Sequence, residues 1–170
     1  MGTFFEQEAQ ELYIRAKAHN CIDDIYADMQ VFKEGVGGQL PFMQMMTNEA
    51  IVDHDKAKLI QSLLPFFKED TQQFFTAFVE DGMYDVIYQG VEHFEWLYHE
   101  HHIKITSAIE LTQQQIQRII AKIAFKMNRV IDTYSTVIDD QIIAGIKVES
   151  HTFISDSTVT AQLKAFQQEV

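Results

Sequence analysis

Side chains that could do chemistry gather in one short stretch, Glu92–His102. Glu95, His99 and His102 stand at i, i+4 and i+7, so on a helix they would share a face and offer one carboxylate and two imidazoles to zinc or iron. Position 103 is isoleucine, so the H-E-x-x-H zinc motif is incomplete. Histidines also suit a helix C-terminus, where they meet the negative end of the dipole. Because no further ligand stands at a readable spacing, we predict neither a physiological metal site nor a cofactor.

The sequence matches none of the other common catalytic patterns. It has no G-x-G-x-x-G, no P-loop and no G-x-S-x-G motif. Gly35–Gly38 follows a helical pattern, so it indicates helix termination. Cys21 precedes two aspartates by two and three positions, and carboxylates raise the pKa of a thiol, which favours an inert side chain. Asp139-Asp140 lies between two expected strands, where a turn is the usual role of Asp. We predict no catalytic residues and no enzymatic activity.

Composition and charge narrow the class further. The 170 residues are 46% hydrophobic and 22% charged, which is typical of a soluble protein with one or two domains. The net charge of −12 disfavours binding to nucleic acid. One cysteine cannot form an internal disulfide, and neither a signal peptide nor a membrane span is apparent. We therefore expect an intracellular protein that reaches a membrane only indirectly, through a partner.

The charge is unevenly distributed along the chain. Residues 1–102 hold 6 Lys+Arg and 18 Asp+Glu, whereas residues 103–170 hold 7 of each. The hydrophobic periodicity changes at the same point, from 3.6 alone to a mixture that includes 2. These two changes predict an acidic domain over 1–102 and a second domain over 103–170.

The first domain shows six amphipathic patterns of helical period. The pattern is clearest where Ile22, Ile25 and Met29 fall at i, i+3 and i+7. The six expected helices run over about 6–19 and 22–32, from Pro41, after Asp53 as far as Pro65, after Asp70 or Thr71 as far as Gly82, and over about 84–98. Short connections between six helices predict an all-α bundle.

The second domain mixes both periods. Residues 103–109 alternate apolar and polar, which predicts a half-buried strand. Thr112 and Gln115 form a capping box that opens a helix. Strands over about 130–137 and 142–148 and a helix over about 157–167 complete a β-α-β-β-α order. The whole chain is expected to be α+β, with a six-helix N-terminal bundle and a small mixed C-terminal domain.

Two surface features remain after the catalytic patterns are set aside. Arg118, Lys122, Lys126 and Arg129 recur at spacings of 4, 4 and 3, giving a basic stripe that suits either an acidic partner helix or solvent. The phenylalanines at 74, 75 and 78 cover more than one side of a short helix. They indicate either core packing or a groove for a partner helix.

Three ordered blocks near the C-terminus resemble a known family. Ser107-Ala108-x-x-Leu111, Val137–Val148 and Asp156-Ser157 are similar, in order and spacing, to the S-A-x-x-L, V-D-P-x-L-I-G-G-I-x-I and D-x-S blocks of the delta subunits of bacterial rotary ATP synthases, relatives of the mitochondrial oligomycin-sensitivity-conferring protein. Tyr13-x-x-Ala16 and the stretch 48–56 resemble N-terminal motifs of that family, with Glu49 in place of the usual proline. Asp140 and Ala144 also depart from the pattern.

The resemblance implies a non-catalytic stator subunit that joins the catalytic head to the b subunits and resists the torque of the rotor. It implies that the N-terminal bundle binds the N-terminal helix of an alpha subunit between the first and fifth helices, around Tyr13, Ala16, Phe75, Phe78 and Val79. It also implies that the C-terminal domain binds the C-terminal region of b, at the cytoplasmic face of the bacterial membrane. We add the prediction that Arg118, Lys122, Lys126 and Arg129 contact b.

Two other functions stay open from the sequence. A free-standing helical adaptor could bind another amphipathic helix through a similar groove. A metal-dependent hydrolase would instead use Glu95, His99 and His102.

Overall fold

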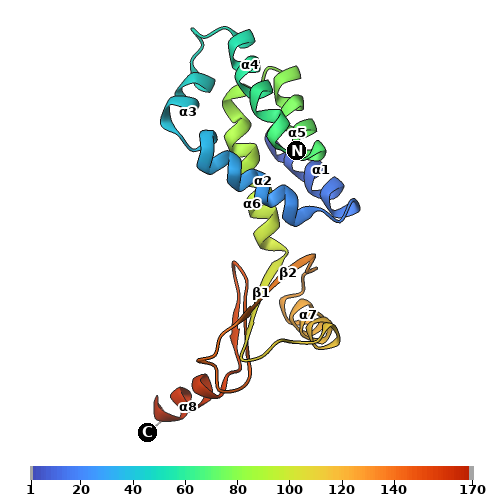
Figure 1. Cartoon of the computed structure of the whole chain (residues 1–170), viewed down its shortest axis with the longest axis vertical. Helices are drawn as coiled ribbons and strands as arrows, with labels where there is room; N and C mark the ends of the chain where they lie inside the picture. Colours follow the sequence, from blue (N-terminus) through green and yellow to red (C-terminus); the bar gives the residue numbers. More distant parts are fainter. Residues whose placement is uncertain (1, 169–170) are drawn as a thin grey trace. The chain divides into compact units, whose positions relative to one another are not determined.

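The computed structural model describes residues 2–168 and divides into two compact units, one ending at Tyr98 and the other beginning at His99 (Figure 1). The division therefore lies four residues before the end of the expected N-terminal domain at His102. Helices make up the first unit, and the second combines helices with a mixed sheet, so the expected α+β class is confirmed. Within residues 2–168 no helix is both long and apolar enough to cross a membrane.

The first unit contains six α-helices among its described residues. They are α1 (Phe4–Ala18), α2 (Ile22–Phe32), α3 (Leu40–Thr47), α4 (Asp53–Leu63), α5 (Glu69–Glu80) and α6 (Ile87–Glu100), whose last two residues belong to the second unit. Pro41 lies in the first turn of α3, where its missing N–H costs nothing. After Phe32 the chain continues as a π-helical turn, Lys33–Gly37, before the glycines end it.

Two expected helix caps are wrong. Val52 precedes α4, and Asp53 is already its first residue. Lys68 precedes α5, so Asp70 and Thr71 lie inside its first turn rather than before it. Their side chains instead reach other helices: the Thr71 hydroxyl donates to Asp28, 2.8 Å away. Tertiary hydrogen bonds have displaced the local capping role that these residue types suggest.

Aromatic side chains dominate the core of the first unit. Phe74, Phe75 and Phe78 of α5 are all fully buried, so the phenylalanines serve packing rather than an open groove. The Phe78 ring packs edge-on against Phe4 of α1, with 5.1 Å between centroids. Phe74 and Phe78 also press on Gly90 of α6, where an added Cβ would lie 2.7 Å from the Phe78 ring. These contacts hold α1, α5 and α6 together.

The second unit is a four-stranded sheet with a helix between its first two strands. Its elements are β1 (His102–Ser107), α7 (Gln113–Met127), β2 (Thr133–Ile138), β3 (Ile146–Glu149), β4 (Ile154–Asp156) and α8 (Val159–Gln168). The strand order is β2-β1-β3-β4, with β1 and β2 parallel and the other pairs antiparallel. A parallel pair needs a crossover, which α7 provides.

The expected β-α-β-β-α order is corrected by one strand. The structure adds β4, whose three residues are too few to show an alternating pattern. The start of β2 and the start of β3 also lie a few residues later than expected. The turn at Asp139-Asp140 is confirmed, since Asp139 Oδ1 accepts a hydrogen bond from the Gln141 backbone N–H at 3.0 Å. The Thr112–Gln115 capping box is confirmed as well.

The buried apolar core of the second unit is small. Ile103 and Ile105 of β1 and Val148 of β3 meet Ile116 and Ile123 of α7. These five residues follow the two periods that the sequence shows, alternate positions on the strands and a helical stripe on α7. The core therefore lies between α7 and one face of the sheet.

Candidate partner-binding surfaces

The residues expected to bind an alpha subunit come together in the structure, but inside the first unit. Tyr13, Ala16, Phe75 and Phe78 all belong to its buried core, and Val79 is half-buried beside them. Helices α1 and α5, which carry these residues, run antiparallel. Phe4 of α1 contacts Phe78 of α5 at one end of the pair, and Arg15 approaches Asp70 at the other. These side chains fix the distance between α1 and α5 and leave little surface for a partner.

The outward face of α5 is hollowed and polar. A shallow pocket of about 480 Å³ is lined by Glu69, Gln72, Gln73, Thr76, Ala77 and Glu80. These positions follow the spacing of one helix face, opposite the buried phenylalanines. Nothing in the sequence singled out this face, because polar residues on a helix indicate solvent as readily as a binding surface.

Acidic side chains surround this part of α1 and α5. Burial raises the pKa of Glu8 on α1, and the nearby carboxylates of Glu11 and Asp81 raise it further, against the opposite effect of Arg15. A raised carboxyl pKa means that negative charge is already costly at this place. The seam between α1 and α5 is thus a surface that an approaching cation would stabilise.

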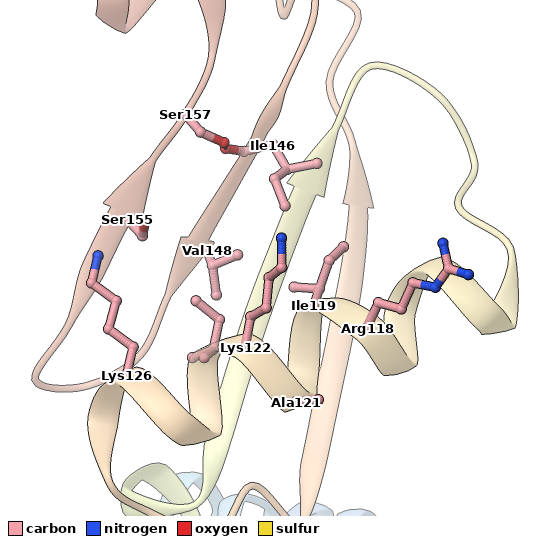
Figure 2. Close-up of a pocket in the computed structure, with 10 residues that line it drawn as sticks. Arg118, Ile119, Ala121, Lys122, Lys126, Ile146, Val148, Ser155 and Ser157 are labelled. Carbon is pink, nitrogen blue, oxygen red and sulfur yellow. The ribbon is translucent and has the colours of Figure 1, made fainter.

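The basic stripe of the second unit borders an apolar groove between α7 and the sheet. The groove has a volume of about 570 Å³ (Figure 2). Its lining is Arg118, Ile119, Ala121, Lys122, Ile123 and Lys126 from α7, with Ile146, Val148, Ser155 and Ser157 from β3, β4 and the residue after β4. Figure 2 shows Lys122 and Lys126 rising from α7 beside the strands, while Ile146 and Val148 point toward the helix. The basic residues were predicted from their spacing in the sequence, whereas the lining residues from β3 and β4 were not predicted.

The fourth basic residue is engaged elsewhere. Arg129 forms an ion pair with Glu100, with 2.5 Å between Nη1 and Oε1, and donates to the Thr152 hydroxyl at 3.3 Å. Lys126 also lies over the Phe153 ring, 5.1 Å from its centroid. Arg118, Lys122 and Lys126 therefore line the groove, whereas Arg129 makes contacts within the second unit outside the groove.

The three candidate metal ligands of the histidine-rich stretch have other partners in the structure. The Glu95 carboxylate accepts hydrogen bonds from the Gln30 amide and, at 2.6 Å, from Lys33. His102 Nδ1 lies 2.8 Å from the Thr133 hydroxyl, and its Nε2 lies 3.2 Å from the Ser135 hydroxyl. Within residues 2–168, Glu95, His99 and His102 do not converge as a ligand cluster.

Comparison with known proteins gives a consistent result across the chain. Residues 9–170 match the family described as "ATP synthase delta (OSCP) subunit". The ATP synthase subunit delta of Mycoplasma pneumoniae is 30% identical over 120 residues, which span 68% of this chain and 67% of that protein. The Enterococcus faecalis subunit delta is 24% identical and covers 99% of this chain, which spans 96% of it.

The fold has a counterpart among solved structures. A chain of the Toxoplasma gondii mitochondrial ATP synthase hexamer superposes with a TM-score of 0.51 at 14% identity, over 99% of this chain and 97% of that one. At this identity the likeness concerns the fold alone. The family match over residues 9–170, with the 30% identical relative from Mycoplasma pneumoniae, shows that the chain belongs to the ATP synthase delta (OSCP) subunit family.

Proposed function

We propose that this chain joins the catalytic head of a proton-translocating rotary ATP synthase to its b subunits and resists the torque of the rotor. Membership of the delta (OSCP) family makes it a non-catalytic component of the peripheral stalk of ATP synthase. The place of action that we propose is the cytoplasmic face of the bacterial membrane, reached through the complex. Such a link needs two separate binding surfaces with slow dissociation, one for each partner.

The first surface is the acidic seam of α1 and α5, and its proposed occupant is the N-terminal helix of an alpha subunit. We take the six helices of this unit as the bundle typical of the family. Four buried side chains would fix the spacing of α1 and α5, namely Tyr13, Ala16, Phe75 and Phe78. The partner helix would contact the pocket on α5 and the exposed side of α1. The surrounding carboxylates favour a helix with basic residues along its rim.

Calorimetric titration with a synthetic alpha N-terminal peptide tests this surface. Ala77→Arg places a bulky cation in the α5 pocket, so we expect at least a tenfold loss of affinity. The matched control is Gln44→Arg, which adds the same side chain at an exposed position of α3 and should leave binding unchanged. Phe78→Ala would be a poor probe, because it removes core volume as well. Absence of binding by the folded wild-type chain would favour a free-standing adaptor instead.

The second surface is the groove of α7, β3 and β4, and its proposed occupant is the C-terminal region of b. The observation that carries this proposal is the combination of an apolar floor, Ile123 and Val148 among others, with a rim of three cations. An amphipathic helix with acidic residues beside its apolar face would fit both properties. Burying that apolar face would enlarge a core that is small in the free unit.

Titration with a peptide from the C-terminus of b tests the second surface separately. Lys122→Glu reverses one rim charge, and we expect a loss of at least tenfold in affinity that shrinks as salt is added. The control is Lys104→Glu, an exposed lysine on β1 that is not part of this groove. Equal losses in both variants would mean that net charge, rather than the groove, governs binding.

A further inference from the structure

Three potential metal ligands converge in the first unit, where the turn between α1 and α2 meets the first turn of α5. His19 Nδ1 lies 2.8 Å from Asp70 Oδ2, and Cys21 Sγ lies 3.6 Å from the same oxygen. One ligand atom from each residue lies within 4.8 Å of the other two. Among residues 2–168, no other group of three or more His, Cys, Asp or Glu side chains has ligand atoms this close together.

We propose that His19, Cys21 and Asp70 bind a zinc ion. Imidazole nitrogen, thiolate sulfur and carboxylate oxygen are the three ligand types that zinc takes in proteins, at about 2.0 to 2.3 Å from the metal. Tetrahedral ligands at those lengths lie about 3.3 to 3.7 Å apart. The separations between Asp70 Oδ2 and the other two ligand atoms need only small adjustments to reach this range. The fourth position is left for water.

The surroundings of Asp70 are compatible with a ligand role. Its Oδ1 faces Arg15, with 3.8 Å to Nε, so Oδ2 remains for the metal. Asp70 is nearly buried, whereas the His19 side chain is 61% exposed, which gives an ion a path from solvent. Arg15 and Lys68 reduce the negative potential here, and Asp24 increases it.

Proton release would accompany binding. Zinc needs the thiolate, and each ion bound at Cys21 must therefore displace one proton. Affinity should rise with pH for this reason.

Such an ion would fasten the α1–α2 turn to α5. Cys21 and His19 lie on either side of Asn20, which has φ +54°, and Asp70 belongs to another helix 49 residues beyond Cys21. A metal that binds the folded unit and not the unfolded chain raises the melting temperature as its concentration increases. It would hold in place the two helices that form the proposed alpha-binding seam, but the inference stands without that proposal.

The test uses the full chain without a histidine tag. Zinc affinity is measured by competition with a chromophoric chelator, and cobalt is then substituted to look for the thiolate-to-metal absorption band. We expect one equivalent bound below micromolar concentration, at least a tenfold weaker affinity in Cys21→Ser and in His19→Ala, and loss of the band in Cys21→Ser. Zinc should raise the melting temperature of the wild type by a few degrees and that of Cys21→Ser by less.

Two matched variants separate this cluster from incidental binding by histidine. His54→Ala removes an exposed histidine of α4, and His101→Ala interrupts the histidine-rich stretch. Both should bind zinc as the wild type does. Wild-type affinity in Cys21→Ser, or no stoichiometric binding at micromolar concentration, would overturn the proposal, and circular dichroism shows that each variant is folded.

Discussion

The two units of the chain differ most in how they bury apolar surface. Among residues 2–165, the first unit has 21 buried hydrophobic residues in one cluster, which includes three phenylalanines of α5, while the second unit has 5. Burial of apolar area is the main stabilising contribution to folding, so the first unit has far more of it per residue. The second unit instead leaves an apolar groove open beside its small core.

This difference suggests how the two surfaces work. A unit with a thick core can present a finished, polar surface such as the outward face of α5, and its partner adds little to the fold. A unit with a thin core and an open groove gains apolar burial when the groove is filled. We therefore expect a partner to stabilise the second unit more than the first.

The largest effect should come from the core of the first unit. Phe78→Ala removes a fully buried ring that touches Phe4, Phe74 and Gly90, so the free energy of unfolding should fall by about 3–5 kcal/mol. The single tryptophan, Trp96, lies in the first unit, and its fluorescence during urea unfolding measures that unit. A loss below 1 kcal/mol would show that Phe78 is exposed in solution, as a groove residue would be.

A backbone change should affect the second unit alone. Gly145 has φ +94°, and a Cβ there would lie 2.4 Å from the Ser157 carbonyl oxygen. Gly145→Ala combines a strained backbone with a clash, which should cost about 2 kcal/mol. The control is Gly35→Ala, whose added Cβ meets nothing within 4 Å.

Hydrogen exchange of the backbone amides measures both glycine variants. In Gly145→Ala the amides of β1 and β3 should exchange faster, while those of α5 keep their wild-type rates. Faster exchange in both units would mean that the two unfold as one, which would remove the contrast between them.

A smaller effect concerns a charge at the edge of the first core. Burial lowers the pKa of Lys33, but its hydrogen bond to Glu95 and the charge of that carboxylate outweigh burial, so the pKa lies above its ordinary 10.5. A raised lysine pKa adds stability that is complete below about pH 10.5 and is lost as the pH rises through the folded-state value.

Glu95→Gln should reduce the stability of the first unit by about 1 kcal/mol at neutral pH, since Lys33 keeps only a neutral partner. The difference in stability between the variant and the wild type should shrink above pH 10.5, because Lys33 then loses its proton and its ion pair with Glu95 in the wild type as well. Urea titrations followed through Trp96 at several pH values measure this. A difference that stays constant into the alkaline range would assign it to packing rather than to the lysine charge.

Local patterns predicted the secondary structure well, and for identifiable reasons. Helical stripes such as Ile22, Ile25 and Met29, the alternation along β1 and the capping box at Thr112 depend on residues near one another in sequence. β4 could not be found this way, because three residues do not establish a period. Its existence depends on pairing with β3.

Partner-binding residues were harder to predict than elements. The same aromatic pattern on α5 suits a buried face and an open groove, and only the packing of α1 and α6 over it decides between them. The basic stripe on α7 was visible in sequence. The apolar floor beside it was not, because Ile146 and Val148 come from a separate strand that begins 20 residues after Lys126. The ion pair between Arg129 and Glu100 could not be predicted either, because the two residues are 29 positions apart in the sequence.

The smallest effect on stability is expected from the groove rim, and it separates binding from folding. Lys122 is exposed on α7, so Lys122→Glu should change the free energy of unfolding by no more than about 0.5 kcal/mol. Filling the groove with the b peptide should raise the melting temperature of the second unit more in the wild type than in Lys122→Glu at the same peptide concentration, because the variant has lost one of the three rim cations. The same peptide should leave the Trp96 transition of the first unit unchanged. If it raised both transitions equally, the two cores would be coupled, and the thin core of the second unit would no longer explain why that unit has the open groove.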